Sequence, residues 1–317
     1  MAGMAVTGKT ATAISGTPEY DSHGGERQGN QMTQHASTAF VFAGGGSLGA
    51  VQVGMLHELM AHGVHPDFVV GSSAGAINAA YFAGAPDASG VSRLEELWST
   101  VRRKDIMPLS LRDMISMLVL RRASLISVTG IRQLLERHLA YRQIEDAALR
   151  LHIVATDNQL GSEVVLSSGP VIEAVMASAA VPGIFPPVQI GGRELVDGGV
   201  ANNTPISVAV KLGATRILVL PAGFACALQR PPATAVAQVL HALSLLVARQ
   251  LVYDLERYAS AAQLVVVPPL CPLDVSPYDY TACASLISRA SLSTRTWLEG
   301  GGLQQPSVPM QLREHSH

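Results

Sequence analysis

The sequence has few charged residues, and no apolar run approaches the length of a membrane span. Only 15% of its 317 residues are charged and the formal net charge is −2, which argues against a concentrated basic surface for nucleic-acid phosphates. A spanning helix needs about 18 or more apolar residues in succession. The amino terminus also lacks the charged start and continuous apolar core of a secretory signal. We therefore expect a soluble, cytoplasmic protein with no nucleic-acid partner.

Cysteine is scarce as well. Cys226, Cys271 and Cys283 form an odd set, without the closely spaced pairs that zinc sites use. Their expected role is that of small buried apolar residues in a reducing compartment, in place of a metal site or a disulfide. We expect no metal and no cofactor.

Hydrophobic residues are abundant at 48%, enough for a sizeable core in one domain. Residues 1–37 are rich in Gly, Ser, Thr and Gln without helical or strand periodicity, which predicts a disordered tail. The domain is expected to cover residues 38–300, with a polar tail at 301–317. No internal repeat or inter-domain linker divides it.

Short apolar runs alternate with helical patterns, and glycine turns separate them. Strands are predicted at 38–42, 68–70, 151–155, 163–166, 195–196, 216–220 and 264–267. Helices are predicted from Leu48 to Gly63 and at 76–83, 171–178 and 233–259. This rhythm is typical of an α/β fold with a mainly parallel central sheet and flanking helices. Within the last helix, one apolar stripe is expected to pack into the core, formed by Val239, Leu243, Leu246, Val247 and Leu251.

The sharpest local pattern is Gly71-x-Ser73-x-Gly75, between the strand at 68–70 and the helix at 76–83. A tight strand-to-helix turn holds a nucleophile clear of the sheet, and its crowded backbone requires small flanking residues. The following helix directs its first amides at the site, which favours developing negative charge. Ser73, and not the neighbouring Ser72, occupies the centre of the pattern.

A second glycine-rich loop, Gly44-Gly45-Gly46-Ser47-Leu48-Gly49, follows the first strand. Successive glycines can direct backbone N–H groups at one point, as an oxyanion hole requires; Gly45 and Gly46 are the expected donors, with the amide of Ala74 as a possible third. The same residues satisfy G-x-G-x-x-G, the dinucleotide fingerprint. That interpretation needs an acidic residue after the next strand, whereas Asp67 lies before it.

A third turn, Asp197-Gly198-Gly199, follows Leu195-Val196. In isolation an Asp-Gly-Gly turn is most simply a surface turn. Three such motifs in this order nevertheless make the chain resemble the patatin-like phospholipases, over about residues 40–220. The stretch SSGPVIEAVMASAAVPGIFPPV is similar to the bacterial branch of that family. One departure is Leu48, where family members often carry a basic residue.

The resemblance implies a three-layer α/β sandwich and a serine acyl-ester hydrolase acting on phospholipid or lysophospholipid. By matching motifs, Ser73 is the nucleophile and Asp197 its partner in a Ser-Asp dyad. Gly44, Gly45 and Gly46 belong to the oxyanion loop, and Gly71, Gly75, Gly198 and Gly199 support the turns. A lipid-binding protein that kept the fold and a nucleotide-binding oxidoreductase are the alternatives.

A mechanism without histidine requires Asp197 to be a stronger base than a solvated carboxylate. Its apolar neighbours Leu195, Val196 and Val200 are expected to raise its pKa, and Asn202 or Asn203 to moderate the rise. A Ser-Asp-His triad is the competing arrangement, but His241 lies within a predicted helix and not on the loop that such a histidine normally occupies.

Residues 103–128 combine apolar side chains with flanking Arg103, Lys104, Arg112, Arg121 and Arg122. A cap helix packed on the core, with solvated arginines, is the expected structure. The alternative is a lid or a surface that contacts a membrane peripherally.

Overall fold

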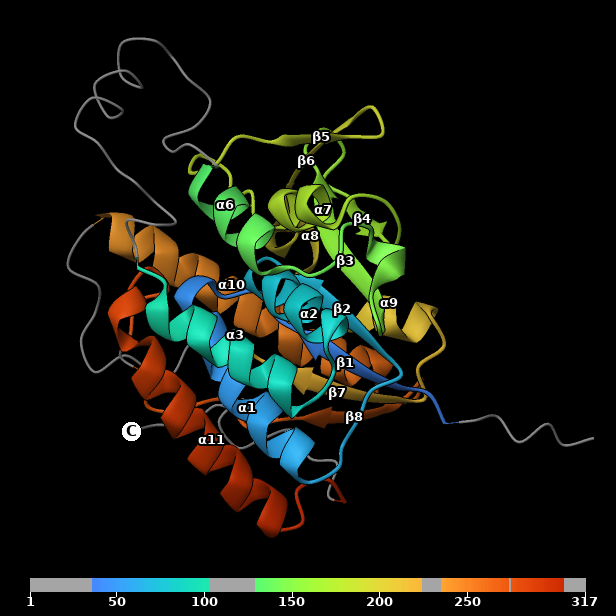
Figure 1. The fold of residues 1–317 in the computed structure, drawn as a ribbon, viewed down its shortest axis with the longest axis vertical. Helices are drawn as coiled ribbons and strands as arrows, with labels where there is room; N and C mark the ends of the chain where they lie inside the picture. The colour runs from blue at the N-terminus through green and yellow to red at the C-terminus, as the bar shows by residue number, and fades with distance from the viewer. Residues whose placement is uncertain (1–35, 103–128, 224–234, 274, 305–317) are drawn as a thin grey trace, which may run out of the picture. The chain divides into compact units, whose positions relative to one another are not determined.

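The computed structural model describes residues 36–102, 129–223, 235–273 and 275–304 (Figure 1). The tail expected at 1–37, the cap segment expected at 103–128 and the tail expected at 301–317 lie wholly or largely outside the described residues. None of the helices in the described part of the chain is long and apolar enough to cross a membrane.

Strands and helices alternate along the chain as predicted. The strands are β1 (Thr38–Phe42), β2 (Phe68–Ser72), β3 (Arg150–Asp157), β4 (Glu163–Leu166), β5 (Val188–Ile190), β6 (Arg193–Asp197), β7 (Arg216–Leu220) and β8 (Gln263–Val266). The α-helices are α1 (Ala50–Ala61), α2 (Ala74–Gly84), α3 (Ala88–Thr100), α6 (Thr129–His138), α7 (Val171–Ser178), α8 (Gly199–Asn202), α9 (Ile206–Lys211), α10 (Ala235–Tyr258) and α11 (Cys283–Glu299). In the described part of the chain, the 3₁₀ turns are η1 (Gly46–Gly49), η2 (Ile144–Asp146) and η3 (Tyr280–Ala282).

The strands form one sheet in the order β5-β6-β3-β2-β1-β7-β8, with β4 also paired to β3. Strands β3, β2, β1, β7 and β8 are parallel, so their carboxyl ends share one edge. Strands β4 and β6 run antiparallel to β3, and β5 runs antiparallel to β6. The sheet is therefore mainly parallel, as expected. Ala155 and Thr156 of β3 pair with both β4 and β6, so these two antiparallel strands lie on opposite sides of β3.

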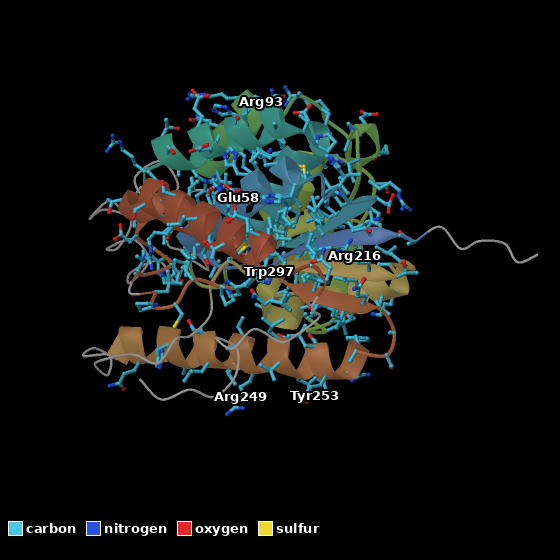
Figure 2. All side chains as sticks on the ribbon, turned by 90° about the horizontal axis from the view of Figure 1, so that it is seen from below. Glu58, Arg93, Arg216, Arg249, Tyr253 and Trp297 are labelled. Atoms are coloured by element: carbon cyan, nitrogen blue, oxygen red, sulfur yellow. The ribbon has the colours of Figure 1, made fainter. Side chains whose placement is uncertain are left out.

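Alternate side chains of the buried strands enter two apolar clusters on opposite faces of the sheet. Phe40 and Phe42 pack with residues of α1, α2, α3, α7 and α11. Ala39 and Val41 pack with residues of α9 and α10. Figure 2 shows α10 on one side of the sheet and α3 and α11 on the other. The protein is thus a three-layer α/β sandwich.

The apolar stripe predicted in α10 is wrong at two positions. Leu243 and Leu246 are 52% and 67% exposed. Leu251 is buried as predicted, and Ala248 and Leu255 are buried with it; the side chain of Val239 lies outside the described residues. Leu246 precedes Leu251 by five residues, which places it on roughly the opposite side of the helix.

The cysteine prediction needs one correction. Cys271 is disulfide-bonded, although we expected no disulfide. Spacing along the chain does not reveal which cysteines a fold brings within bonding distance. Cys283 is free and buried, as expected of a small apolar residue.

Candidate active site

Ser73 occupies the sharp turn between β2 and α2. Its φ of 55° and ψ of −125° make it the one non-glycine residue with positive φ among the residues described. Such a conformation costs of order 1–3 kcal/mol and persists only where the surroundings impose it. The glycines on either side permit the turn. A Cβ on Gly71 would lie 2.5 Å from the Gly75 carbonyl oxygen, and one on Gly75 would lie 2.3 Å from that of Phe42.

Strand register places Asp197 beside Ser73. Ser72 is the partner of Val154 in the β2–β3 pair, and Asp197 is the partner of Ala155 in the β3–β6 pair. The carboxyl end of antiparallel β6 therefore stops level with the end of β2. Ser73 Oγ donates a hydrogen bond to Asp197 Oδ2 at 2.6 Å. The two residues that the sequence motifs single out are in direct contact.

The Asp-Gly-Gly turn fits tightly against the neighbouring strands and is not a surface turn. A Cβ on Gly198 would lie 2.1 Å from the Val154 carbonyl oxygen and 2.6 Å from Ser72 Oγ. A Cβ on Gly199 would lie 2.8 Å from Asn203 Oδ1. Both glycines are needed because any side chain would displace the backbone that carries Asp197.

Asp197 is a buried carboxyl group with neutral hydrogen-bond donors. Its side chain is 6% exposed, and Oδ1 accepts the Gly199 N–H at 2.7 Å while Oδ2 accepts Ser73 Oγ–H. Burial raises the pKa of Asp197 to about 6, and these two hydrogen bonds partly oppose the rise. Within the described ranges it forms no ion pair with a lysine, arginine or histidine.

The neighbours of Asp197 differ in part from those predicted. Leu195 and Val196 are buried as expected, but Val200 is 58% exposed and contributes little to desolvation. The prediction that Asn202 or Asn203 moderates the pKa is wrong. The Asn202 amide donates to Glu163 and Ser207, and the Asn203 amide donates to the Gly44 carbonyl oxygen.

Ser178 is a residue of the site that the sequence analysis missed. Its fully buried hydroxyl accepts the Ser73 N–H at 2.9 Å and donates to the Val154 carbonyl oxygen at 2.6 Å. Its own carbonyl accepts the Gly198 N–H at 3.1 Å. Ser178 thus ties the serine turn and the aspartate turn to β3. A single serine in an apolar helix gives no sequence signal for this role.

The glycine-rich loop passes directly against Ser73. A Cβ on Gly44 would lie 2.9 Å from Ser73 Cβ, and the Gly44 N–H donates to the Asn203 carbonyl oxygen at 3.0 Å. The N–H groups of Gly45, Gly46 and Ala74 donate to no acceptor among the described residues. The loop therefore carries uncommitted donors at Gly45 and Gly46, whereas the amide of Gly44 is engaged in positioning.

Leu48, the departure from the family pattern, is buried in this loop. Its side chain is 7% exposed. The nearest atom to a Cβ built on Gly223 is Leu48 Cδ1, at 2.6 Å. An apolar side chain at this position is accommodated by the core.

The competing arrangements lack their required contacts. Among the described residues no histidine bonds to Ser73 or Asp197: His57 contacts Glu95, His152 contacts Ser167, and His241 lies within α10. Asp67 lies at the amino-terminal edge of the sheet, where its carboxylate accepts the Thr38 N–H at 2.7 Å. It is therefore at the opposite edge from the glycine loop, not beside it as a ribose-binding carboxylate would be.

Comparisons with known proteins agree with the motifs. Residues 40–210 match the model of the Patatin-like phospholipase family. Patatin-like phospholipase domain-containing protein 7 of Mus musculus is 31% identical over 198 residues, which are 61% of this chain and 14% of that protein. An uncharacterized NTE family protein of Mycobacterium tuberculosis is 33% identical over 175 residues, 54% of this chain and 28% of that protein. The chain thus spans a minor part of the curated relatives that it matches.

Two solved structures with lower sequence identity also match. Human GIVD cytosolic phospholipase A2 in complex with methyl gamma-linolenyl fluorophosphonate is 13% identical, with a TM-score of 0.46; the match covers 84% of this chain and 58% of that one. VipD from Legionella pneumophila is 16% identical, with a TM-score of 0.40; the match covers 84% of this chain and 67% of that one. Since the family model matches more than half of the sequence, the chain belongs to the patatin-like phospholipase family.

Proposed function

We propose that this protein is a serine acyl-ester hydrolase that cleaves lipid esters, phospholipid or lysophospholipid, with Ser73 as nucleophile and Asp197 as general base. The observation that carries the proposal is the 2.6 Å contact between Ser73 Oγ and Asp197 Oδ2, made by a carboxyl group that is buried without a cation. Family membership supports the substrate class. Peripheral contact with a membrane is part of the proposal, because the substrate resides there.

The first half of the reaction acylates the enzyme. Ser73 Oγ attacks the ester carbonyl carbon while its proton passes to Asp197 Oδ2. The carbonyl oxygen becomes an oxyanion, which the N–H groups of Gly45 and Gly46 stabilise, with Ala74 as a third donor. The intermediate then collapses: the carbon–oxygen bond to the alcohol breaks, and Asp197 returns its proton to the departing alcohol. An acyl group remains on Ser73.

Hydrolysis of the acyl-enzyme reverses these roles. A water molecule attacks the acyl carbonyl carbon and gives a proton to Asp197. Collapse of the second intermediate breaks the bond to Ser73 Oγ, which recovers a proton from Asp197 as the fatty acid leaves. A base with a pKa of about 6 suits both directions, because it is charged at neutral pH and still accepts a proton readily.

The first test is hydrolysis of short- and long-chain p-nitrophenyl esters and of phosphatidylcholine by wild type, Ser73→Ala and His241→Ala. We expect Ser73→Ala to lose turnover and covalent labelling by a fluorophosphonate, and His241→Ala to retain both. A wild-type protein that turns over no ester and is not labelled would indicate the lipid-binding alternative. Turnover that survives Ser73→Ala would refute the proposal, and loss of several orders of magnitude in His241→Ala would favour a triad.

A further inference from the structure

The oxyanion loop, residues 44–49, forms hydrogen bonds near both ends with two other parts of the chain. At its start, the Gly44 N–H donates to the Asn203 carbonyl oxygen at 3.0 Å. At its end, the Ser47 N–H donates to the Pro277 carbonyl oxygen at 2.8 Å. The two uncommitted amides, Gly45 and Gly46, lie between these ties.

The tie at Ser47 is reinforced by two further contacts. The Ser47 side chain is completely buried, and its Oγ donates to the Ser276 carbonyl oxygen at 3.2 Å. Gly46 adopts a φ of 59°, and a Cβ there would lie 2.4 Å from the Pro277 carbonyl oxygen. Residues 276 and 277 therefore lie against the half of the loop that contains Gly46.

Residues 276 and 277 are positioned by contacts of the segment that follows them with α3 and the loop. The ring of Tyr280 stacks on that of Trp98 in α3, with centroids 6.4 Å apart and an interplanar angle of 7°. The Asp279 N–H donates to the Ser276 carbonyl oxygen at 2.9 Å. Cys283, the first residue of α11, is buried with its Sγ 3.9 Å from the Ser47 carbonyl oxygen. Helices α3 and α11 thus set the position of this segment.

Three successive glycines have unusual backbone freedom, which conflicts with what an oxyanion hole requires. Donors stabilise a developing charge efficiently only if they are oriented before the charge appears. Gly44, Gly45 and Gly46 have no side chains that could restrict the loop, so the hydrogen bonds at its ends contribute to its order. The hydrogen bond to Asn203 comes from the residue after α8, within the family match at 40–210, whereas the hydrogen bond to Pro277 comes from outside that match.

We propose that Ser276 and Pro277, acting through Ser47, are a positioning element of the oxyanion hole. Their two carbonyl oxygens hold the Ser47 amide and hydroxyl and thereby orient the amides of Gly45 and Gly46. This inference rests on the proposed function. It assigns a role in turnover to a segment outside the family match, because the match ends at residue 210 and Pro277 lies 67 residues later.

The test compares Ser47→Ala with Thr294→Val in the full-length protein. Ser47→Ala removes the hydroxyl bonded to Ser276, whereas Thr294→Val removes an equally buried hydroxyl that has no partner in the described structure. For a p-nitrophenyl ester we expect Ser47→Ala to lower kcat about tenfold with KM changed less than about twofold, because donors are misoriented and not removed. Thr294→Val should retain wild-type kcat.

A second measurement separates positioning from general damage. An alkyl trifluoromethyl ketone adds to Ser73 Oγ, so that the ketone oxygen becomes an oxyanion and the hydroxyl proton passes to Asp197. Its inhibition constant should rise in Ser47→Ala by the same factor by which kcat/KM falls. Wild-type kcat and inhibition in Ser47→Ala would overturn the inference.

If Ser47→Ala is not folded by circular dichroism, Pro277→Gly provides the same test, since it keeps the carbonyl acceptor but frees the backbone that directs it. Wild-type kcat in that variant would likewise overturn the inference. An inactive wild type that a fluorophosphonate does not label would refute the proposed function instead, and is distinguishable from both results.

Discussion

Two carboxyl groups in this protein are buried to a similar extent, but their pKa values are shifted in opposite directions. Glu58 in α1 is 5% exposed, and Asp197 after β6 is 6% exposed. Glu58 accepts hydrogen bonds from Arg295 and Ser291 of α11, which faces α1 (Figure 2). The hydrogen bond from Arg295 is the main cause that lowers the pKa of Glu58, and the Ser291 hydroxyl adds to it. Asp197 has two neutral donors, and burial raises its pKa to about 6.

The difference shows that burial alone does not make a carboxylate a base. A cation stabilises the charged form, so Glu58 is held as a carboxylate with little affinity for a proton. Without a cation the desolvation cost is only partly offset by the two hydrogen bonds, so Asp197 has a raised affinity for a proton. Glu58 therefore joins two helices, whereas the raised pKa of Asp197 fits the proposed role of a general base. Asp197→Asn and Glu58→Gln each replace the acid with its amide, so the two variants test this difference by the same chemical change.

The largest expected effect is on turnover. Asp197→Asn cannot accept the Ser73 proton, so we expect kcat/KM for a p-nitrophenyl ester to fall about 10³- to 10⁴-fold. Glu58→Gln lies in the α1–α11 interface and should keep kcat/KM within about twofold of wild type. Comparable losses in the two variants, both folded, would show that the contrast has no bearing on catalysis.

The next effect is a gain in stability in Asp197→Asn. An unperturbed aspartate has a pKa of 3.8, whereas the pKa of Asp197 in the folded protein is about 6. The folded protein therefore binds this proton more tightly than the unfolded chain does. Stability is therefore lost as pH rises between these values, by up to about 3 kcal/mol for a shift of this size.

Asp197→Asn lacks this titration. We expect chemical denaturation at pH 8 to show the variant more stable than wild type, by up to about 3 kcal/mol, and the difference to shrink toward pH 4. A variant that is no more stable at pH 8 would mean that the charged carboxylate is better solvated than its burial implies.

The smallest effect has the opposite sign, in Glu58→Gln. A lowered pKa contributes stability that is present above the unfolded value of 4.5 and is lost as pH falls through the folded value. At pH 7 we expect the free energy of unfolding of Glu58→Gln to be about 1 kcal/mol below that of wild type. The loss is modest because the Arg295 side chain is 53% exposed and solvent screens the ion pair. The deficit should vanish in acid, where wild-type Glu58 is protonated; a deficit independent of pH would indicate lost packing.

The sequence predicted the parts of the site that local backbone chemistry dictates. A serine at positive φ needs glycine on both sides, and Gly71 and Gly75 have no space for a side chain. The same holds for Gly198 beside Asp197. Such constraints act within a few residues, so they leave readable motifs. The end of α1 at Ala61, two residues before Gly63, and the strand at 38–42 were predictable for the same reason.

Long-range contacts left no comparable signal. The antiparallel direction of β6 brings Asp197 level with Ser73, but a strand of five residues does not reveal its direction. Ser178 and Asn203 act through partners more than 100 residues away, Ser73 and Gly44. The stripe of α10 was wrong because apolar residues occur around most of that helix, so periodicity could not select the buried side.

The most direct test of the central claim is the pH dependence of Ser73 labelling by a fluorophosphonate, in wild type and Asp197→Asn. Labelling requires an activated hydroxyl but no product release, so its rate reports proton transfer to the base. We predict a wild-type rate that rises with pH through about 6 and is constant above it, as Asp197 loses its proton. Asp197→Asn should react slowly at every pH. A wild-type rate without an inflection near 6, or an Asp197→Asn rate equal to it, would contradict the assignment of Asp197 as the base.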